Sequence, residues 1–349
     1  RRLRRWRKSA SDHLMGTRHM EPLGIALGSG LPPADIVESV KLAEEIGYDS
    51  AWIIEGHGGD QFSLLTACAL ATRRMRLGTA ISSVFLRTAP TIAMAAACLD
   101  HFSSGRFVLG LGSSHKVQVE AEHGVHYADP VARVRETVEV IRALLRDGVI
   151  SYRGKTITIE KFELWFKPAH SSVPVFLSAR FPQMLALCGE VADGLLMVFS
   201  TIGSARNARE YLSVGTARAG RSVEQLEICS LLPATVAADR KTAYDRMRPV
   251  LAFYVGFFPR YRRLARAAGF VSAVDATAEA FKRGGVEAAS PAVSDEMVAT
   301  LTVAGTAHDV RTRIAEFRRS GIALPIIMPV TDAGDDAAGK AEIIQECAG

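Results

Sequence analysis

Two histidines and a glutamate stand in glycine-rich stretches where this chain could transfer protons. Glu55 and His57 lie in the run Glu-Gly-His-Gly-Gly, and His115 follows the run Gly-Leu-Gly-Ser-Ser at residues 110–114. Imidazole titrates near neutral pH, so either histidine could deliver or accept a proton during catalysis. A single loop histidine is also commonly just solvated, and both interpretations stay open for His57 and His115.

The glycine-rich run at residues 110–115 could also hold a cofactor. Free backbone N–H groups and the hydroxyls of Ser113 and Ser114 suit a phosphate group or the polar edge of a ring. The run lacks the third glycine of a dinucleotide fingerprint and therefore gives little support to a Rossmann site. The chain also lacks H-E-x-x-H, clustered metal-ligand Cys and His, a G-x-S-x-G elbow and a P-loop, so we predict no metal site and no hydrolase.

Apolar runs that alternate with helix-like segments provide the scaffold for these residues. The runs are short and continuous, and most of them end in glycine or polar residues, as buried parallel strands do. They cover residues 23–28, 50–55, 75–84, 106–112, 173–178, 194–199, 226–236 and 322–330. Eight parallel strand–helix units close a barrel of about 250 residues, so we predict an α/β fold, the (β/α)8 TIM barrel, with its active site at the strand ends. A doubly wound open sheet is the alternative, but the chain shows no polar break at a switch point.

Local signals predict where several helices begin and end. Gly47 predicts the end of the first helix. Asp129, which is followed by proline, predicts a helix start with its own side chain as the N-cap. Thr306 and Asp309 have capping-box spacing at the start of another helix.

Two segments break the alternation and are predicted to be insertions. Residues 151–159 are typical of a β-hairpin that closes on Gly154 and Lys155. Residues 254–300 predict a long helical excursion, with aromatic side chains clustered at residues 253–261. That cluster could wall a substrate pocket, although its helical spacing is more typical of ordinary core or of a subunit contact.

The basic charge of the chain is concentrated at its start. Residues 1–19 hold seven Lys or Arg and one acid, and removing this net +6 from the formal +5 leaves about −1 for residues 20–349. We expect residues 1–19 to be a disordered leader or tag and residues 20–349 to form a single domain. The balanced body predicts no nucleic-acid partner, and no apolar run suggests a membrane span. Five scattered cysteines indicate core thiols in a reducing cytoplasm.

Several stretches together resemble the luciferase-like monooxygenase superfamily. The resemblance is strongest to the branch that uses the deazaflavin coenzyme F-420, typified by methylenetetrahydromethanopterin reductase. The matching stretches are residues 43–52 (AEEIGYDSAW), 77–81, 99–112 (LDHFSSGRFVLGLG), 174–179, 189–194 (GEVADG) and 303–306. They are spread along the whole barrel, which makes the resemblance specific although no single stretch would suffice.

The resemblance implies where a coenzyme would bind. In this family a non-prolyl cis peptide lies behind the coenzyme ring, and the matching bond joins Ala80 and Ile81. Arg180 would suit the phosphate or the acidic tail as a charge-assisted donor. The positions implied to contact the coenzyme are Thr79, Ala80, Ile81, Ser82, Gly112, Ser113, Ser114, Gln118, Ser178, Ala179, Arg180, Phe181, Gln183 and Met184.

The chain departs from the family pattern at three places. Related enzymes usually have Asp-His after the second strand, where this chain has Glu55 and a glycine, with His57 one position later. Their glycine-rich loop after the fifth strand is replaced here by Arg180 and Phe181. Related sugar-phosphate dehydrogenases have glutamate at the position of His115, so their proton relay does not carry over intact.

We therefore expect an oxidoreductase that transfers a hydride between F-420 and a small organic substrate, with His57, His115 or Glu55 handling the proton. One alternative is an FMN-dependent two-component monooxygenase served by a separate reductase. Another is a non-catalytic barrel that binds flavin or a protein partner. Members of the family commonly pair through helices, so we also expect a homodimer.

Overall fold

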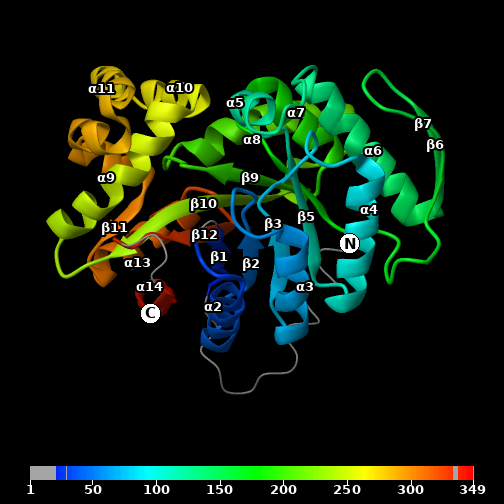
Figure 1. The fold of residues 1–349 in the computed structure, drawn as a ribbon, viewed down its shortest axis with the longest axis horizontal. Helices are drawn as coiled ribbons and strands as arrows, with labels where there is room; N and C mark the ends of the chain where they lie inside the picture. Colours follow the sequence, from blue (N-terminus) through cyan, green and yellow to red (C-terminus); the bar gives the residue numbers. More distant parts are fainter. Residues whose placement is uncertain (1–20, 29, 333–336, 349) are drawn as a thin grey trace.

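The computed structural model describes residues 21–28, 30–332 and 337–348 and shows a closed barrel (Figure 1). The expected leader, residues 1–19, lies outside these residues. Each barrel strand pairs in parallel with two neighbours, and the pairing of the last strand with the first closes the ring. The barrel strands are β1 (Gly24–Leu27), β2 (Ser50–Ile53), β3 (Arg76–Thr79), β5 (Phe107–Gly112), β8 (Val175–Ser178), β9 (Gly194–Val198), β10 (Glu227–Val236) and β12 (Leu324–Pro329). The predicted TIM barrel is confirmed and the open sheet is excluded.

Helices lie between the strands and cover the outside of the barrel. They are α2 (Pro33–Ile46), α3 (Gln61–Ala71), α4 (Ala89–Phe102), α6 (Pro130–Asp147), α7 (Pro182–Val191), α8 (Ser204–Arg218), α13 (Ala307–Arg319) and α14 (Ala337–Ala348). The first helix ends at Gly47, whose φ of 109° is left-handed, as predicted. The capping box of Thr306 and Asp309 is also confirmed.

Large side chains fill the barrel interior. The rings of Trp52 and Phe176 lie 5.8 Å apart, and both side chains are almost fully buried. Glycines on adjacent strands make room for them: a Cβ on Gly78 would lie 2.3 Å from the Trp52 ring, and one on Gly194 would lie 2.6 Å from the Phe176 ring. The interior is therefore a packed core that supports the strand ends.

The third apolar run, residues 75–84, is not one continuous strand as predicted. It divides into β3 and the short β4 (Ser82–Ser83), and the Ala80–Ile81 peptide bond between them is cis, as the family resemblance implies. Across this break the Thr79 hydroxyl replaces the strand ladder, since it donates to Gly110 O at 2.7 Å and accepts from Gly110 N at 2.8 Å. A bulge of this kind re-aims the residues that follow it.

The predicted hairpin forms, but Asp129 does not cap α6 with its side chain. The hairpin consists of β6 (Val149–Arg153) and β7 (Thr158–Glu163) in antiparallel pairing. Asp129 has a left-handed φ of 48°, and its carboxylate accepts from Lys155 Nζ at 2.7 Å instead. The Glu136 carboxylate accepts from the backbone N–H groups of residues 155–157, so the hairpin tip is tied to α6.

The helical excursion forms a separate hydrophobic cluster on the barrel, away from the hairpin (Figure 1). Its helix α10 lies near the short helix α5 (Lys116–Ala121), which follows β5 (Figure 1). The excursion comprises α9 (Arg240–Phe257), α10 (Pro259–Ala267), α11 (Val271–Ala289), which is kinked at Gly284 and Gly285, α12 (Asp295–Leu301) and β11 (Val303–Gly305).

An ion-pair network joins strands at the end of the barrel opposite the strand C-termini. Arg76, at the start of β3, donates to Asp49 at 2.9 Å and to Glu227 at 2.9 Å. The Arg76 side chain is largely buried. These contacts join β3 to the starts of β2 and β10 across the end of the barrel where the strands begin.

Four cysteines are buried, as expected of core thiols, but Cys98 on α4 is exposed, which corrects that expectation. Burial raises the pKa of the Cys68 and Cys188 thiols to about 12, so both stay protonated.

In the part of the chain that the structure covers, none of the helices has the length and apolar content needed to cross a membrane.

Candidate functional site at the barrel mouth

Residues from three strands meet where β3, β5 and β8 end. A Cβ placed on Gly112 would lie 2.9 Å from Cγ1 of Ile81 and 3.3 Å from Cβ of Ser178. Ile81 follows the cis peptide bond directly. The break after β3 thus brings Ile81 against the end of β5, and only glycine at position 112 leaves room for it. Three of the predicted coenzyme positions are therefore neighbours in space.

An apolar floor with a polar edge covers the barrel core at this end. Ile54, Ile81, Val198 and Met328 are half-buried and pack on the interior cluster from four different strand ends. Ser82 directly follows Ile81, its side chain is fully buried, and its Oγ has no hydrogen-bond partner among the residues that the structure describes. The apolar floor fits a ligand with a flat apolar face, and buried polar atoms such as Ser82 Oγ normally have partners. A flavin or deazaflavin ring has both a flat apolar face and polar edge atoms.

Glu55 is held by contacts that fix its carboxylate. One oxygen accepts from Ser83 N at 2.8 Å, and the other forms an ion pair with Arg87. Arg87 also pairs with Asp60, whose side chain caps α3 by accepting from Ser63 N at 2.9 Å. Glu55 therefore anchors β4 just beyond the cis bond, and its oxygens are already engaged. This geometry suits a positioning residue better than the proton-transfer group predicted from the sequence.

The two predicted histidines lie in different environments. The His57 side chain is 72% exposed and its Nε2 lies 2.9 Å from a carboxylate oxygen of Glu122, after α5. His115 is half-buried at the start of α5, with its ring 4.3 Å from Phe258 and 5.4 Å from Tyr261, centroid to centroid. Of the two, His115 lies within the mouth and His57 faces solvent.

Its surroundings keep the His115 imidazole neutral. Burial, with a further contribution from the positive charge of Arg260, lowers the pKa of His115 to about 4. At neutral pH the ring therefore offers one N–H donor and one nitrogen acceptor. Its free nitrogen can accept a hydrogen bond from a substrate hydroxyl, whereas the lowered pKa makes the ring a weak proton acceptor at neutral pH.

Arg260 of α10 holds the loop after β5, which sequence reasoning did not predict. It donates to Ser114 O at 2.7 Å and to the Tyr127 hydroxyl at 2.6 Å, and lies 3.4 Å from Ser113 Oγ. Ser114 has a φ of 55°, a left-handed conformation that is unusual for a non-glycine residue. Nothing local in the sequence links residues 114 and 260, so this contact could be found only in the folded structure.

Arg180 is a cation without a carboxylate partner at the mouth. Its guanidinium donates to Val198 O at the end of β9, and no Asp or Glu of the described residues pairs with it. Burial lowers the pKa of Arg180 to about 10, so the group remains charged at neutral pH. A desolvated, unpaired cation favours an anionic ligand, and the phosphate predicted to bind here would satisfy it.

The remaining predicted coenzyme residues divide between core and surface. Thr79 is fully buried and bonded to Gly110 through both its donor and its acceptor, so its role is to hold the bulge. Ala179 is buried in the core, and Met184 packs against the same cluster. Ala80 belongs to the interior cluster, Gln118 is half-buried on α5 and Gln183 is exposed on α7.

The aromatic segment of the excursion lies at the mouth, not in a remote core. Tyr254 and Tyr261 contact Phe199, with ring centroids 4.6 Å and 5.3 Å away. Phe199 directly follows β9 and has a left-handed φ of 52°. Burial raises the pKa of both tyrosines, so their hydroxyls stay protonated at neutral pH. The rings pack into the hydrophobic cluster of the excursion, as the core alternative predicts, and Tyr261 also contacts His115 at the mouth.

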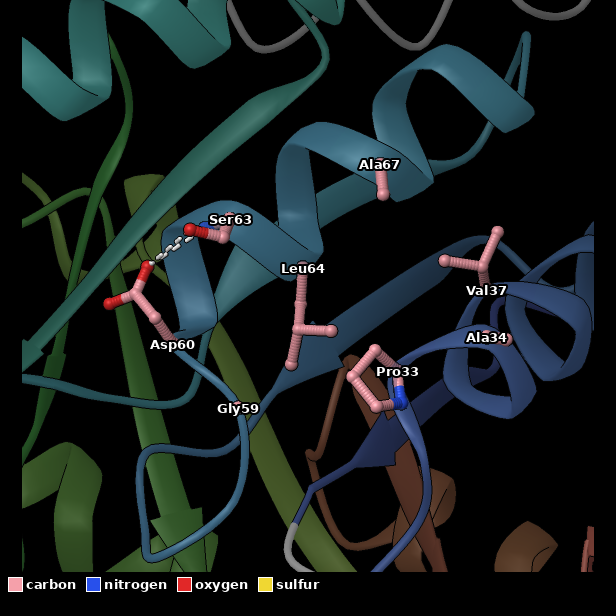
Figure 2. A pocket seen from close by; sticks show the side chains of 8 residues that line it. All are labelled: Pro33, Ala34, Val37, Gly59, Asp60, Ser63, Leu64 and Ala67. Atoms are coloured by element: carbon pink, nitrogen blue, oxygen red, sulfur yellow. Dashed lines mark hydrogen bonds between the residues drawn. The ribbon is translucent and has the colours of Figure 1, made fainter.

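A separate cavity of about 350 Å³ opens between the first turns of α2 and α3 (Figure 2). Its wall is mostly apolar, with Leu64 and Val37 facing each other and Asp60 at one end. It contains none of the predicted site residues. Asp60 links it to Glu55 through the shared ion-pair partner Arg87.

Comparison with known proteins agrees with the resemblance found in the sequence. The sequence profile described as luciferase-like monooxygenase matches residues 15–324. A putative coenzyme F420-dependent oxidoreductase of Mycobacterium tuberculosis is 31% identical over 93% of this chain and 97% of its own. A 5,10-methylenetetrahydromethanopterin reductase of Archaeoglobus fulgidus is 33% identical over 81% of this chain and 86% of its own.

A solved structure shows the same architecture. The coenzyme F420-dependent tetrahydromethanopterin reductase of Methanopyrus kandleri superposes with a TM-score of 0.83 at 25% identity. The superposition covers 94% of this chain and 97% of the reductase. The similarity therefore extends over nearly the whole of both chains.

Proposed function

This chain belongs to the luciferase-like monooxygenase family, and from that premise we propose that it transfers a hydride between coenzyme F-420 and a small organic substrate. The observation that supports this most directly is the mouth itself. The apolar floor includes Ile81, the next residue, Ser82, has an unpaired buried hydroxyl, and Arg180 supplies a cation without a carboxylate partner among the described residues. A planar ring with an anionic tail suits all three features.

In this proposal each group has a distinct task. Bound F-420 would supply the ring carbon that gives or takes the hydride. Ile81 and Gly112 shape the surface on which the ring rests, and Arg180 holds an anionic group of the coenzyme. His115 accepts the proton of a substrate hydroxyl when the hydride leaves the substrate carbon, and returns it in the reverse direction; a negative charge on the bound substrate would favour this step by raising the lowered pKa of His115. Glu55 keeps β4 in place.

Titration of the protein with F-420 and, separately, with FMN tests the proposal. We expect tight F-420 binding, weak FMN binding and at least tenfold weaker F-420 binding for Arg180→Gln. Preference for FMN, with oxygen-dependent turnover of reduced FMN, would favour the two-component monooxygenase. Binding of F-420 without turnover across a broad panel of alcohols and aldehydes would favour a non-catalytic barrel. Binding of neither coenzyme would overturn both enzymatic interpretations and every coenzyme role assigned above, and would leave only a barrel that binds a protein partner.

A further inference from the structure

Helix α10 is strongly basic and contains no acidic residue. Residues 246–274 contain six arginines, four of them in α10, and no aspartate or glutamate. Two of these four have contacts within the excursion: Arg266 pairs with Asp275, and Arg262 donates to backbone carbonyl groups at the end of α9. The other two, Arg260 and Arg263, contact the loops of the barrel mouth.

Arg260 keeps hydrogen-bonding capacity beyond its structural contacts. The acceptors that it meets, Ser114 O, Ser113 Oγ and the Tyr127 hydroxyl, are all uncharged. A guanidinium has five N–H donors, so three such contacts leave two donors free. No carboxylate of the described chain pairs with it, and its charge is felt at His115, where it helps to lower the pKa.

Arg263 is stacked on a residue that departs from the family pattern. Its Cζ lies 3.9 Å from the centroid of the Phe181 ring, and its side chain is otherwise exposed. Stacking fixes the plane of a guanidinium and leaves its N–H groups free at the edge. The Phe181 side chain, which stands where related enzymes have a glycine-rich loop, therefore serves as a platform for Arg263.

We propose that Arg260 and Arg263 form a binding site for an anionic group, a carboxylate or a phosphate, on the substrate. Guanidinium groups bind both anions through paired, charge-assisted hydrogen bonds. The inference rests on the proposed function because the substrate must reach the coenzyme at the mouth. Since Arg260 lies beside His115, an anion bound there belongs to the molecule whose proton His115 handles. Arg180, at the ends of β8 and β9, remains for the coenzyme.

The test uses inorganic phosphate and acetate as probes in calorimetric titrations of the F-420-saturated protein. The variant is Arg260→Gln combined with Arg263→Gln, and the matched control is Arg319→Gln, an exposed arginine at the end of α13 that has no acidic partner in the part of the chain that the structure describes. We expect the double variant to bind the preferred probe at least tenfold more weakly than wild type and the control. F-420 affinity should stay within twofold in the control and in Arg263→Gln, since Arg263 does not contact the loop at Ser113 and Ser114. The probe that binds more tightly identifies the anion.

Two results would overturn the proposal. One is that wild type, double variant and control all bind each probe with the same affinity, or that none of them binds either probe. The other is a loss of F-420 affinity in the double variant with unchanged probe binding, which would assign these arginines to the coenzyme tail. If the loss of Arg260 unfolds the protein, Arg263→Gln alone should weaken probe binding at least threefold. If wild type binds no F-420, the proposed function fails, while the same titrations of the coenzyme-free protein still test the anion site.

Discussion

The chemistry of this mouth depends on residues whose ionisation is set by the fold. His115 is kept neutral by burial and by Arg260, whereas Arg180 stays charged although it is desolvated. A neutral base beside cations is suited to a substrate that brings its own negative charge. Protonation of His115 in the folded protein therefore carries a free-energy penalty.

That penalty predicts a pH-dependent stability. In the unfolded chain histidine titrates near pH 6.5, whereas in the fold His115 titrates near pH 4, so the unfolded chain binds more protons between these values. Stability should therefore fall as the pH drops through this window, by about 3 kcal/mol in total, and the penalty is absent above pH 6.5. His115→Leu keeps an apolar contact and has no such penalty.

Urea unfolding of wild type and His115→Leu between pH 7.5 and pH 4 measures this effect. Contributions from the carboxylates are the same in both proteins and cancel in the difference between their free energies of unfolding. This difference should shift in favour of the variant as the pH falls, because only wild type has His115 to protonate. A difference that does not change with pH would show that His115 titrates normally in the fold.

At the level of elements, the break between β3 and β4 creates the surface of the mouth. Thr79 takes over the hydrogen bonds that the strand gives up, and Glu55 fixes the start of β4. Ile81 then packs against Gly112 at the end of β5. A residue larger than glycine does not fit at position 112 unless its neighbours move, because Ile81 and Ser178 approach too closely to leave room for a side chain.

Gly112→Ala should therefore damage the mouth more than the fold. The added methyl group would lie 2.9 Å from Ile81 Cγ1, so Ile81 must shift, and overpacking of this kind costs about 1–3 kcal/mol. We expect F-420 affinity to fall at least tenfold in a fluorescence titration. The control is Gly203→Ala, which has no atom closer than 4.0 Å and should bind as wild type does. Equal affinities for the two variants would show that Ile81 does not support the ring.

The elements themselves were largely predictable, because each depends on a local pattern. Every predicted barrel strand is present, and the signals at Gly47 and Thr306 act as expected. The failures arise where a long-range contact overrides the local signal. Asp129 has the sequence of an N-cap, yet Lys155 of the hairpin captures its carboxylate.

The site was less predictable for the same physical reason. Its positions follow from strand ends and from family resemblance, but the partners of those positions come from distant segments. Arg87 binds Glu55 from beyond the next strand, and Arg260 reaches the loop at Ser114 from the excursion. No spacing in the sequence encodes such pairings.

At the scale of the molecule, the barrel separates function from stability. The mouth holds unpaired charges and half-buried rings, whereas the opposite end is closed by Arg76 and its two carboxylate partners. In TIM barrels, residues at the strand N-termini contribute to stability and those at the C-termini to catalysis. Substitutions at the two ends should therefore have separable effects.

Arg76→Met should destabilise the protein without affecting coenzyme binding. Removing the cation leaves Asp49 and Glu227 without this counterion; the cost is about 3–5 kcal/mol for a fully buried pair and is smaller here, because the Asp49 side chain is 36% exposed. We expect a lower urea midpoint and a Kd for F-420 within twofold of wild type. Lys241→Met, which removes an exposed pair with Asp245, should change stability by less than about 1 kcal/mol. A loss of F-420 affinity in folded Arg76→Met would contradict the separation.

The outer faces of α3 and α4 indicate how two copies of the chain could associate. Leu70 is 69% exposed on α3, and Met94 and Phe102 are 40% and 50% exposed on α4. α3 contains no charged residue, and the only carboxylate of α4, Asp100, is buried. A helix that is apolar on all sides is normally buried, and solvent-facing helices of a barrel ordinarily have charged outer faces. We propose that these faces form the interface of the homodimer expected from the family resemblance.

Light scattering on Leu70→Glu combined with Met94→Glu tests this interface. Wild type should have twice the chain mass of 37.6 kDa, and the variant should have the mass of one chain, because a buried carboxylate pair related by two-fold symmetry is strongly unfavourable. Trp165→Glu is the matched control, since Trp165 is 95% exposed and lies just after the hairpin, in the stretch between β7 and β8. That variant should remain dimeric. A monomeric wild type would refute the dimer, and a dimeric double variant would place the interface elsewhere. Because the mouth is built from one chain, the monomeric variant should still bind F-420, which separates assembly from the chemistry of the site.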